Sequence, residues 1–302
     1  MTVTTEVRPP EGEAAPRRHP VATWMYRHPK ARLALLLLVP LAWLLVVYLG
    51  SLAMLFVTAF WSVDSFTGQI ERTFTLQNFI DIATDPAYLS VALRTIGIAA
   101  AVTVLASIIG LPMAFYMARV ARPSRRALLV ALVLTPLWAS YLVKVFSWRT
   151  MFQPETGVIA WLLNPFGLDS PGYGALATIV TLTYLWLPYM ILPLYAGLER
   201  IPDSLVEASS DLGAHTWRTV RSVVMPILWP SLVAGSIFTF SLSMGDYITV
   251  QIVGGKLQML GNVVYQNFTL NLPFAAAVAT IPVLVMVVYL WAVRRTGALD
   301  NL

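Results

Sequence analysis

The segment Ser204–Pro226, SLVEASSDLGAHTWRTVRSVVMP, is polar and lies between two long apolar runs. Ser204 and Glu207 have the spacing of a capping box, which predicts that a helix begins at Ser204 and that Gly213 ends it. Small and apolar side chains recur at helical spacing on one face, at Leu205, Ala208, Ser209 and Leu212. A helix of about eight residues is roughly 12 Å long, whereas the hydrocarbon core of a bilayer is about 30 Å thick. We therefore expect this helix to pack against protein rather than lipid.

The composition is that of a membrane protein. Of the 302 residues, 58% are hydrophobic and 12% are charged, about half the charged fraction of a soluble domain. The net charge of +5 is spread over short loops rather than gathered on one face, which argues against nucleic acid as a partner. Cysteine is absent, and the three histidines are not paired at ligand spacing, so we expect no metal site.

Six uncharged apolar runs are each long enough to cross a bilayer as a helix. They are Leu33–Trp61, Thr95–Ala118, Ala127–Val143 with an extension to Trp148, Tyr173–Leu198, Ser222–Gly245 and Phe274–Val293. Residues 1–30 are rich in Pro, Glu and Arg and predict a disordered tail. Residues 31–302 are therefore expected to form an all-α, polytopic membrane domain with six transmembrane helices.

The basic residues predict the orientation of these helices. Fifteen of the 20 Lys and Arg residues fall on the side that holds both termini and the Ser204–Pro226 segment. Because basic residues are concentrated in cytoplasmic loops, we expect both termini and this segment to be cytoplasmic. The tail would then be a cytoplasmic tail of a multi-pass protein.

The fifth apolar run carries a polar face. Ser236, Thr239, Ser243 and Asp246 follow one another at steps of three and four, so they should point into protein or water. An aspartate at the centre of a membrane helix costs about 2.5 to 3.5 kcal/mol, which makes Asp246 a functional candidate. The alternative is that Asp246 lies near the outer end of the run, partly hydrated, and caps the turn that the chain makes at Gly254 and Gly255.

Aromatic side chains give a second set of candidates. Tyr184 and Trp186 precede Pro188 in the fourth run, and their rings could stack on a passing cation. They could equally pack helices together or lie in an interfacial belt. With Tyr247, which follows Asp246, they complete the predicted substrate pathway.

The chain lacks an energy-coupling or catalytic motif of its own. Gly255-Lys256 is the nearest approach to a phosphate-binding loop, but the required upstream glycine and following Ser or Thr are missing. Sequence signatures of zinc proteases and of serine hydrolases are also absent. We therefore expect a transporter rather than an enzyme, driven by another subunit or by an ion gradient.

The Ser204–Pro226 segment resembles the EAA motif of ABC importer permeases: Glu-Ala-Ala, three residues, Gly, nine residues, Ile, one residue, Leu-Pro. The matching positions here are Glu207, Ala208, Ser209, Gly213, Val223, Met225 and Pro226. The resemblance implies a type I importer permease fold in which residues 199–226 form a coupling segment that docks on a separate ATP-hydrolysing subunit. Its predicted contact residues are Glu207, Ala208, Ser209, Leu212, Gly213 and Pro226. The capping box also allows Glu207 a purely structural role.

Two further stretches, Thr135–Trp148 and Ser241–Phe268, resemble the spermidine/putrescine subgroup of these permeases. The resemblance implies import of a small polycation by alternating access in the bacterial inner membrane. It also implies a second permease subunit, two ATP-binding subunits that would hold ATP and magnesium, and an extracytoplasmic substrate-binding protein. No cofactor is expected in this chain. The alternatives are a permease for ferric iron, thiamine or an aminoalkylphosphonate, or an ion-coupled secondary transporter, for which inverted repeats would be expected.

Overall fold

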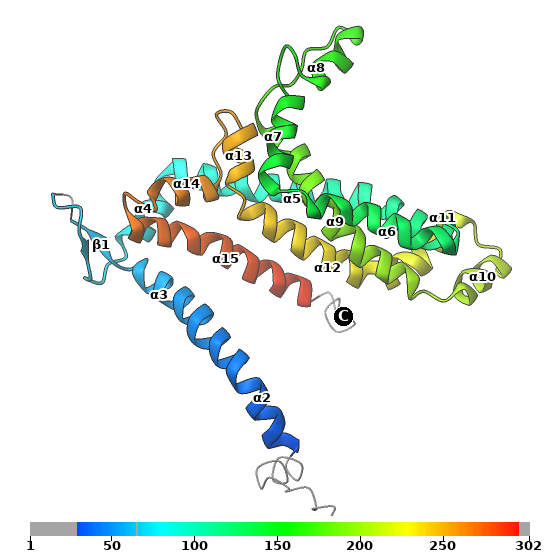
Figure 1. Cartoon of the computed structure of the whole chain (residues 1–302), viewed down its shortest axis with the longest axis horizontal. Coiled ribbons are helices and arrows are strands. Elements are labelled where there is room, and N and C mark those ends of the chain that lie inside the picture. The colour runs from blue at the N-terminus through cyan, green and yellow to red at the C-terminus, as the bar shows by residue number, and fades with distance from the viewer. Residues whose placement is uncertain (1–28, 65, 296–302) are drawn as a thin grey trace, which may run out of the picture. The chain divides into compact units, whose positions relative to one another are not determined.

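The computed structural model describes residues 29–64 and 66–295, most of which are helical (Figure 1). The chain divides into two units, Met1–Leu55 and Phe56–Leu302. The first contains α2 (Pro29–Trp43), the π-helical segment η1 (Leu44–Leu49) and most of α3 (Gly50–Thr58). Most of the predicted tail, residues 1–28, lies outside the described residues, and α2 already includes residues 29 and 30.

The second unit begins with a short antiparallel hairpin, in which Ser62 of β1 (Ser62–Val63) lies opposite Glu71 of β2 (Ile70–Glu71). Between the strands, the backbone N–H groups of Thr67 and Phe66 donate to Asp64 and hold the pKa of its carboxyl below the usual value. The elements that follow are α4 (Gln77–Thr84), α5 (Pro86–Phe115), η2 (Tyr116–Val120), α6 (Pro123–Trp138), α7 (Tyr141–Met151), α8 (Val158–Leu163), η3 (Asn164–Phe166), α9 (Ala175–Glu199), α10 (Asp203–Asp211), α11 (Thr216–Thr219), η4 (Val220–Val224), α12 (Met225–Met244), α13 (Ile248–Val253), α14 (Leu260–Asn267) and α15 (Leu272–Arg294).

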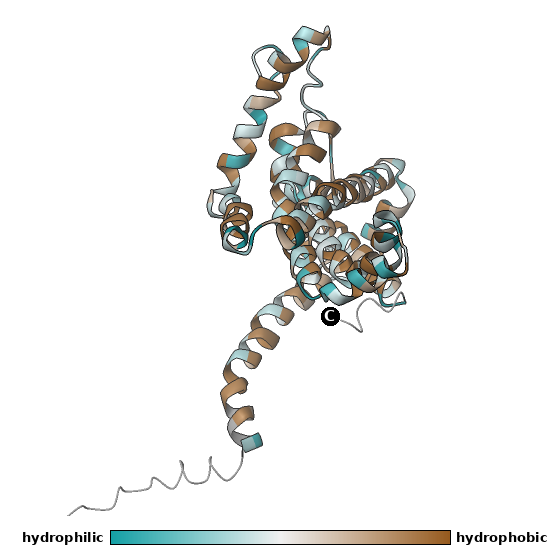
Figure 2. Cartoon of the chain, turned by 90° about the vertical axis from the view of Figure 1, so that its right-hand side faces the viewer, coloured by the Kyte–Doolittle hydropathy of each residue, from teal (hydrophilic) through white to brown (hydrophobic). Residues whose placement is uncertain are grey.

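Five helices of the described chain are long and apolar enough to cross a membrane. They are Leu36–Thr58, Pro86–Val120, Ala175–Glu199, Thr216–Met244 and Leu272–Arg294. Hydrophobic residues predominate along these helices (Figure 2). They correspond to five of the six predicted runs, because a helix is the only single-segment structure that satisfies its own backbone in lipid.

The third predicted run forms two helices, α6 and α7, that meet at an angle of 90°. Between them, Ala139 has an extended backbone conformation and that of Ser140 is also non-helical, which interrupts the hydrogen-bond ladder of the helix. The predicted extension of this run to Trp148 is therefore wrong as a continuous helix. The pair counts as a sixth span only if both helices are taken as one broken span.

Close packing of α5, α9 and α12 forms the centre of the second unit. Met190 of α9 is fully buried between Gly110 of α5 and Gly235 of α12. A Cβ atom at residue 235 would lie 2.7 Å from the Met190 sulfur and 3.2 Å from its Cα. The two glycines thus allow a close approach of the helix backbones, as small residues do at membrane helix contacts.

The packing predicts that Gly235→Val lowers the melting temperature of the purified chain, because the added methyl groups overpack the contact with Met190, at a cost of about 1 to 3 kcal/mol. Thermal unfolding followed by tryptophan fluorescence measures the change. Gly97→Val is the matched control, since a Cβ at this exposed helical position meets nothing within 4 Å. Equal melting temperatures for the two variants would contradict the packing role of Gly235.

Candidate functional site

The short helix predicted from the polar segment is present as α10, at one end of the bundle (Figure 1). It begins at Asp203, one residue earlier than expected, and its N-cap is Pro202 with no side-chain hydrogen bond. The predicted capping box of Ser204 and Glu207 is therefore wrong, since Ser204 already lies inside the first turn. Glu207 is exposed on the body of the helix, and Asp203 supplies the acidic group that favours a helix N-terminus.

Gly213 ends α10 as predicted, with a φ of +74° in the left-handed region. The N–H of Gly213 donates to the carbonyl of Ser210 at 2.9 Å, and that of Ala214 donates to Ser209 at 3.1 Å. These two bonds form a Schellman motif, which most often uses glycine at this position. The Ser209 hydroxyl also lies 2.9 Å from the Thr219 hydroxyl, so side chains as well as backbone fix the angle between α10 and α11.

Arg119 of η2 ties α10 to the spanning helices. Its guanidinium pairs with the carboxylate of Asp203 and donates to the carbonyls of Leu198, at 2.7 Å, and Ile201. One side chain therefore holds the end of η2, the last turn of α9 and the first turn of α10. The local sequence around Arg119 gives no sign of this anchor, because the elements that it joins are about 80 residues apart in the chain.

The face of α10 that carries Leu205, Ala208 and Leu212 is exposed. Leu212 is 88% exposed and Trp217 is 74% exposed, and Leu205 and Ala208 are exposed with them. No part of the described chain covers these side chains. An exposed apolar patch rimmed by polar residues is typical of a protein-protein contact surface.

Pro226 lies in the first turn of α12, directly after the π-helical turn η4. A proline donates no backbone hydrogen bond to the preceding turn, and widened turns are a common response to an interrupted ladder. The helix that contains it begins at Thr216 rather than at the predicted Ser222. The part of the polar segment from Thr216 onward is thus continuous with the fifth span, whereas α10 is separated from it by the turn at Gly213.

Asp246 lies beyond the opposite end of α12 and is 7% exposed. One carboxylate oxygen accepts the N–H of Thr249 at 2.8 Å, and the other accepts the Thr249 hydroxyl at 3.1 Å and the Tyr141 hydroxyl. The structure therefore places Asp246 as a cap on α13. Tyr141, the first residue of α7, connects this cap to α7. The turn that is capped lies at the start of α13, not at the later glycines that the sequence suggested.

A hollow of about 400 Å³ lies beside this carboxylate. Asp246, Tyr247 and Trp186 line it together with Tyr141, whose ring stacks on Trp186 with centroids 6.1 Å apart. The indole N–H of Trp186 is buried and has no hydrogen-bond partner among the described residues. The ring of Tyr247 stacks on Tyr265 at 4.7 Å. Three of the predicted pathway residues are therefore brought together, next to aromatic faces.

The other polar residues of the fifth run point into protein, as predicted. Thr239 and Ser243 are fully buried and donate to carbonyls of their own helix, and Thr239 lies 3.4 Å from the hydroxyl of Thr103 in α5. Ser236 lies 2.6 Å from the hydroxyl of Tyr289 in α15. In this structure the three residues join helices, and their place in a substrate pathway stays a prediction.

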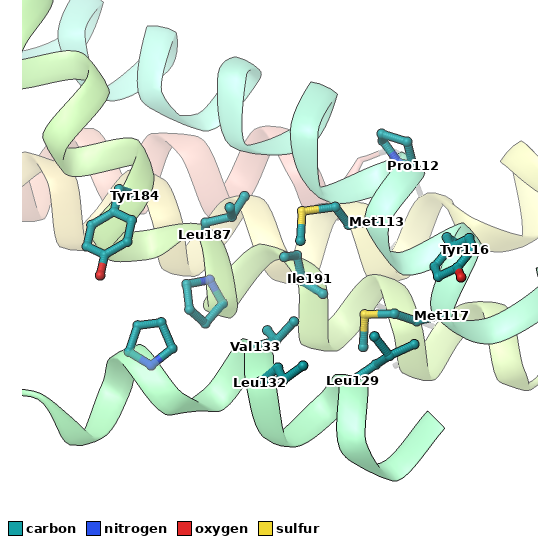
Figure 3. A pocket seen from close by; sticks show the side chains of 12 residues that line it. Pro112, Met113, Tyr116, Met117, Leu129, Leu132, Val133, Tyr184, Leu187 and Ile191 are labelled. Carbon is teal, nitrogen blue, oxygen red and sulfur yellow. The ribbon is translucent and has the colours of Figure 1, made fainter. Parts of the chain in front are cut away.

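Tyr184 lines a different cavity, of about 560 Å³, between α5, η2, α6 and α9 (Figure 3). The side chains around it are almost all aliphatic, proline or methionine. Within residues 29–64 and 66–295, no group of three or more His, Asp or Glu side chains could hold a metal ion.

Comparison with known proteins identifies relatives over most of the chain. The family model described as "Binding-protein-dependent transport system inner membrane component" matches residues 106–295. The inner membrane ABC transporter permease protein YdcU of Escherichia coli is 41% identical over 93% of this chain and 95% of its own. The spermidine/putrescine transport system permease protein PotB of Haemophilus influenzae is 31% identical over 75% of this chain and 81% of its own.

Solved structures with the same fold come from ABC importers. A chain of a bacterial importer of the acidic polysaccharide alginate has a TM-score of 0.64 at 16% identity, covering 92% of this chain and 99% of its own. A chain of the MetNI methionine transporter has a TM-score of 0.54 at 21% identity, covering 71% of this chain and 95% of its own. At these identities the likeness establishes the fold alone.

The contacts of Arg119 predict that Arg119→Gln loosens α10. Charge-assisted hydrogen bonds contribute about 1.5 to 3 kcal/mol, so amide hydrogen exchange over residues 203–214 should accelerate about tenfold or more. Arg218→Gln on the neighbouring helix is the control, because Arg218 is exposed and its side chain makes no hydrogen bond or ion pair with the described residues. Unchanged hydrogen exchange in the Arg119→Gln variant would show that Arg119 does not hold α10 in place.

Proposed function

This chain belongs to the family of inner membrane components of binding-protein-dependent transport systems, and we propose that it imports a small polycation, with spermidine or putrescine as the favoured substrates. It is a permease subunit of an ABC importer and not an enzyme. Its spanning helices form a multi-pass protein of the inner membrane. The proposal concerns the substrate, the partners and the residues that serve each.

The observation that carries the polycation proposal is the carboxylate of Asp246 beside the hollow. Among the described residues, Asp246 forms no ion pair with a basic side chain; the ion pair that these residues do form joins Arg119 to Asp203. Its hydroxyl and amide donors leave the negative charge uncompensated, so a cation in the hollow would be attracted to it. The faces of Trp186 and Tyr247 supply further favourable contacts for an ammonium group. The identity with the spermidine/putrescine permease points to the same substrate class.

The second part of the proposal concerns energy coupling. The patch of Leu205, Leu212 and Trp217 docks in a cleft on an ATP-hydrolysing subunit in the cytoplasm, with Glu207 at its rim. Two such subunits, a second permease and an extracytoplasmic substrate-binding protein complete the importer. Both termini are cytoplasmic in this assembly. Closure of the ATP-binding subunits moves α10, and Arg119 passes this movement to η2 and α9.

The carboxylate role predicts that Asp246→Asn raises the KM for spermidine and putrescine about tenfold or more while the melting temperature stays close to that of the wild type. Asparagine still accepts the N–H of Thr249 and is as good a helix cap as aspartate, but it carries no charge. Initial rates of labelled uptake in vesicles at limiting substrate measure the effect. Wild-type uptake by the Asn variant would return Asp246 to a capping role alone.

The coupling role predicts that Gly213→Val allows ATP hydrolysis but reduces uptake per ATP several-fold. A β-branched residue is strained at a φ of +74°, so α10 would leave its fixed angle. Gly213→Asn is the matched control, because asparagine tolerates the left-handed conformation and should retain coupling. ATP turnover and uptake are measured together in reconstituted vesicles. Normal coupling in the Val variant at normal expression would argue against docking through this turn.

A further inference from the structure

Two hollows of the second unit meet at shared residues. The aliphatic cavity between α5, η2, α6 and α9 is elongated, with Tyr184 near one end and Tyr116 near the other (Figure 3). A second hollow of about 670 Å³ lies at the turn from η2 to α6. Tyr116 and Leu129 line both, so the two hollows adjoin at the Tyr116 end.

The two hollows differ in chemistry. Three prolines line the aliphatic cavity, from α5, α6 and α9, and because proline rings interrupt regular helix packing they leave space there. Met113 and Met117 add flexible side chains that adapt to an irregular apolar occupant. The second hollow instead carries two arginines, Arg122 and Arg125.

These arginines are available for an anion. Arg122 and Arg125 are both exposed, and neither side chain makes a hydrogen bond or ion pair with the described residues. Their neighbours differ in this respect, since Arg119 pairs with Asp203 and Arg126 donates to the carbonyl of Ala121 at 3.3 Å. Arginine binds phosphate through its planar set of donors.

We propose that the two adjoining hollows together bind one anionic phospholipid. An acyl chain lies in the aliphatic cavity between Tyr116 and Tyr184, and the headgroup phosphate lies against Arg122 and Arg125. Basic pockets between membrane helices are known to take such headgroups. A polycationic substrate is disfavoured here, because the cavity offers it no carboxylate and its mouth carries two positive charges. The site is separate from Asp246 and does not depend on which substrate is transported.

The test is native mass spectrometry of the full-length chain in its assembled transporter, with phosphatidylglycerol or phosphatidylcholine added in detergent. The wild type should retain one phosphatidylglycerol and at least about fivefold less phosphatidylcholine. Arg122→Gln/Arg125→Gln should lower retained phosphatidylglycerol about tenfold. Arg294→Gln/Arg295→Gln, which removes two positive charges at the end of α15, is the matched control and should retain the wild-type amount.

A second pair of variants separates the two parts of the site. Val133→Trp fills the aliphatic cavity and should reduce retention while both arginines remain. Arg122→Lys/Arg125→Lys keeps the charge and should preserve most of the binding. Wild-type retention by the double Gln variant, or equal loss in the control, would overturn the proposal. The proposal would also be overturned if Val133→Trp left lipid retention unchanged but caused loss of the second permease subunit. That result would show that a helix of the partner subunit occupies the cavity.

Discussion

The contact that the rest of the structure depends on is the guanidinium of Arg119 between three helix ends. A nine-residue helix such as α10 cannot cross the membrane and is marginal on its own, so its position must come from tertiary contacts. Arg119 supplies them by binding the Asp203 carboxylate together with one carbonyl in the last turn of α9 and one just after it. The Schellman turn at Gly213 and the Ser209 to Thr219 contact fix the other end. Because α10 is fixed at both ends, a displacement of this helix is transmitted to the elements that it contacts.

After the turn at Gly213, a single helix leads from α10 towards the Asp246 carboxylate. The span Thr216–Met244 has 29 residues and is roughly 44 Å long, and it ends two residues before Asp246. Close packing at Gly235 and Met190 joins this helix to α5 and α9 along its length. Tyr141 then joins Asp246 to the bend between α6 and α7. Under the proposed function, movement at one end therefore reaches a charged site at the other through packed and hydrogen-bonded groups.

The sequence predicted what depends on length, periodicity and local conformation. Five of the six apolar runs, the short polar helix and its end at Gly213 followed from such rules and are present in the described residues. It did not predict the bend at Ala139, because an uninterrupted apolar run carries no signal for a change of direction. The helix start at Asp203 and the anchoring role of Arg119 were missed because both depend on contacts between segments about 80 residues apart in the chain. The capping of α13 by Asp246 was one of two open alternatives, and the Tyr141 contact had no counterpart in the local sequence.

The most direct test is labelled uptake of spermidine, putrescine and ferric iron into vesicles that contain the assembled transporter and its substrate-binding protein, with and without ATP. The account predicts uptake of a polyamine that requires ATP and exceeds that of ferric iron by at least about tenfold, since ferric iron would lack the aromatic contacts offered to an extended ammonium chain. ATP-dependent uptake of ferric iron without uptake of either polyamine would contradict the proposed substrate class. Polyamine uptake driven by an ion gradient without ATP would contradict the coupling mechanism.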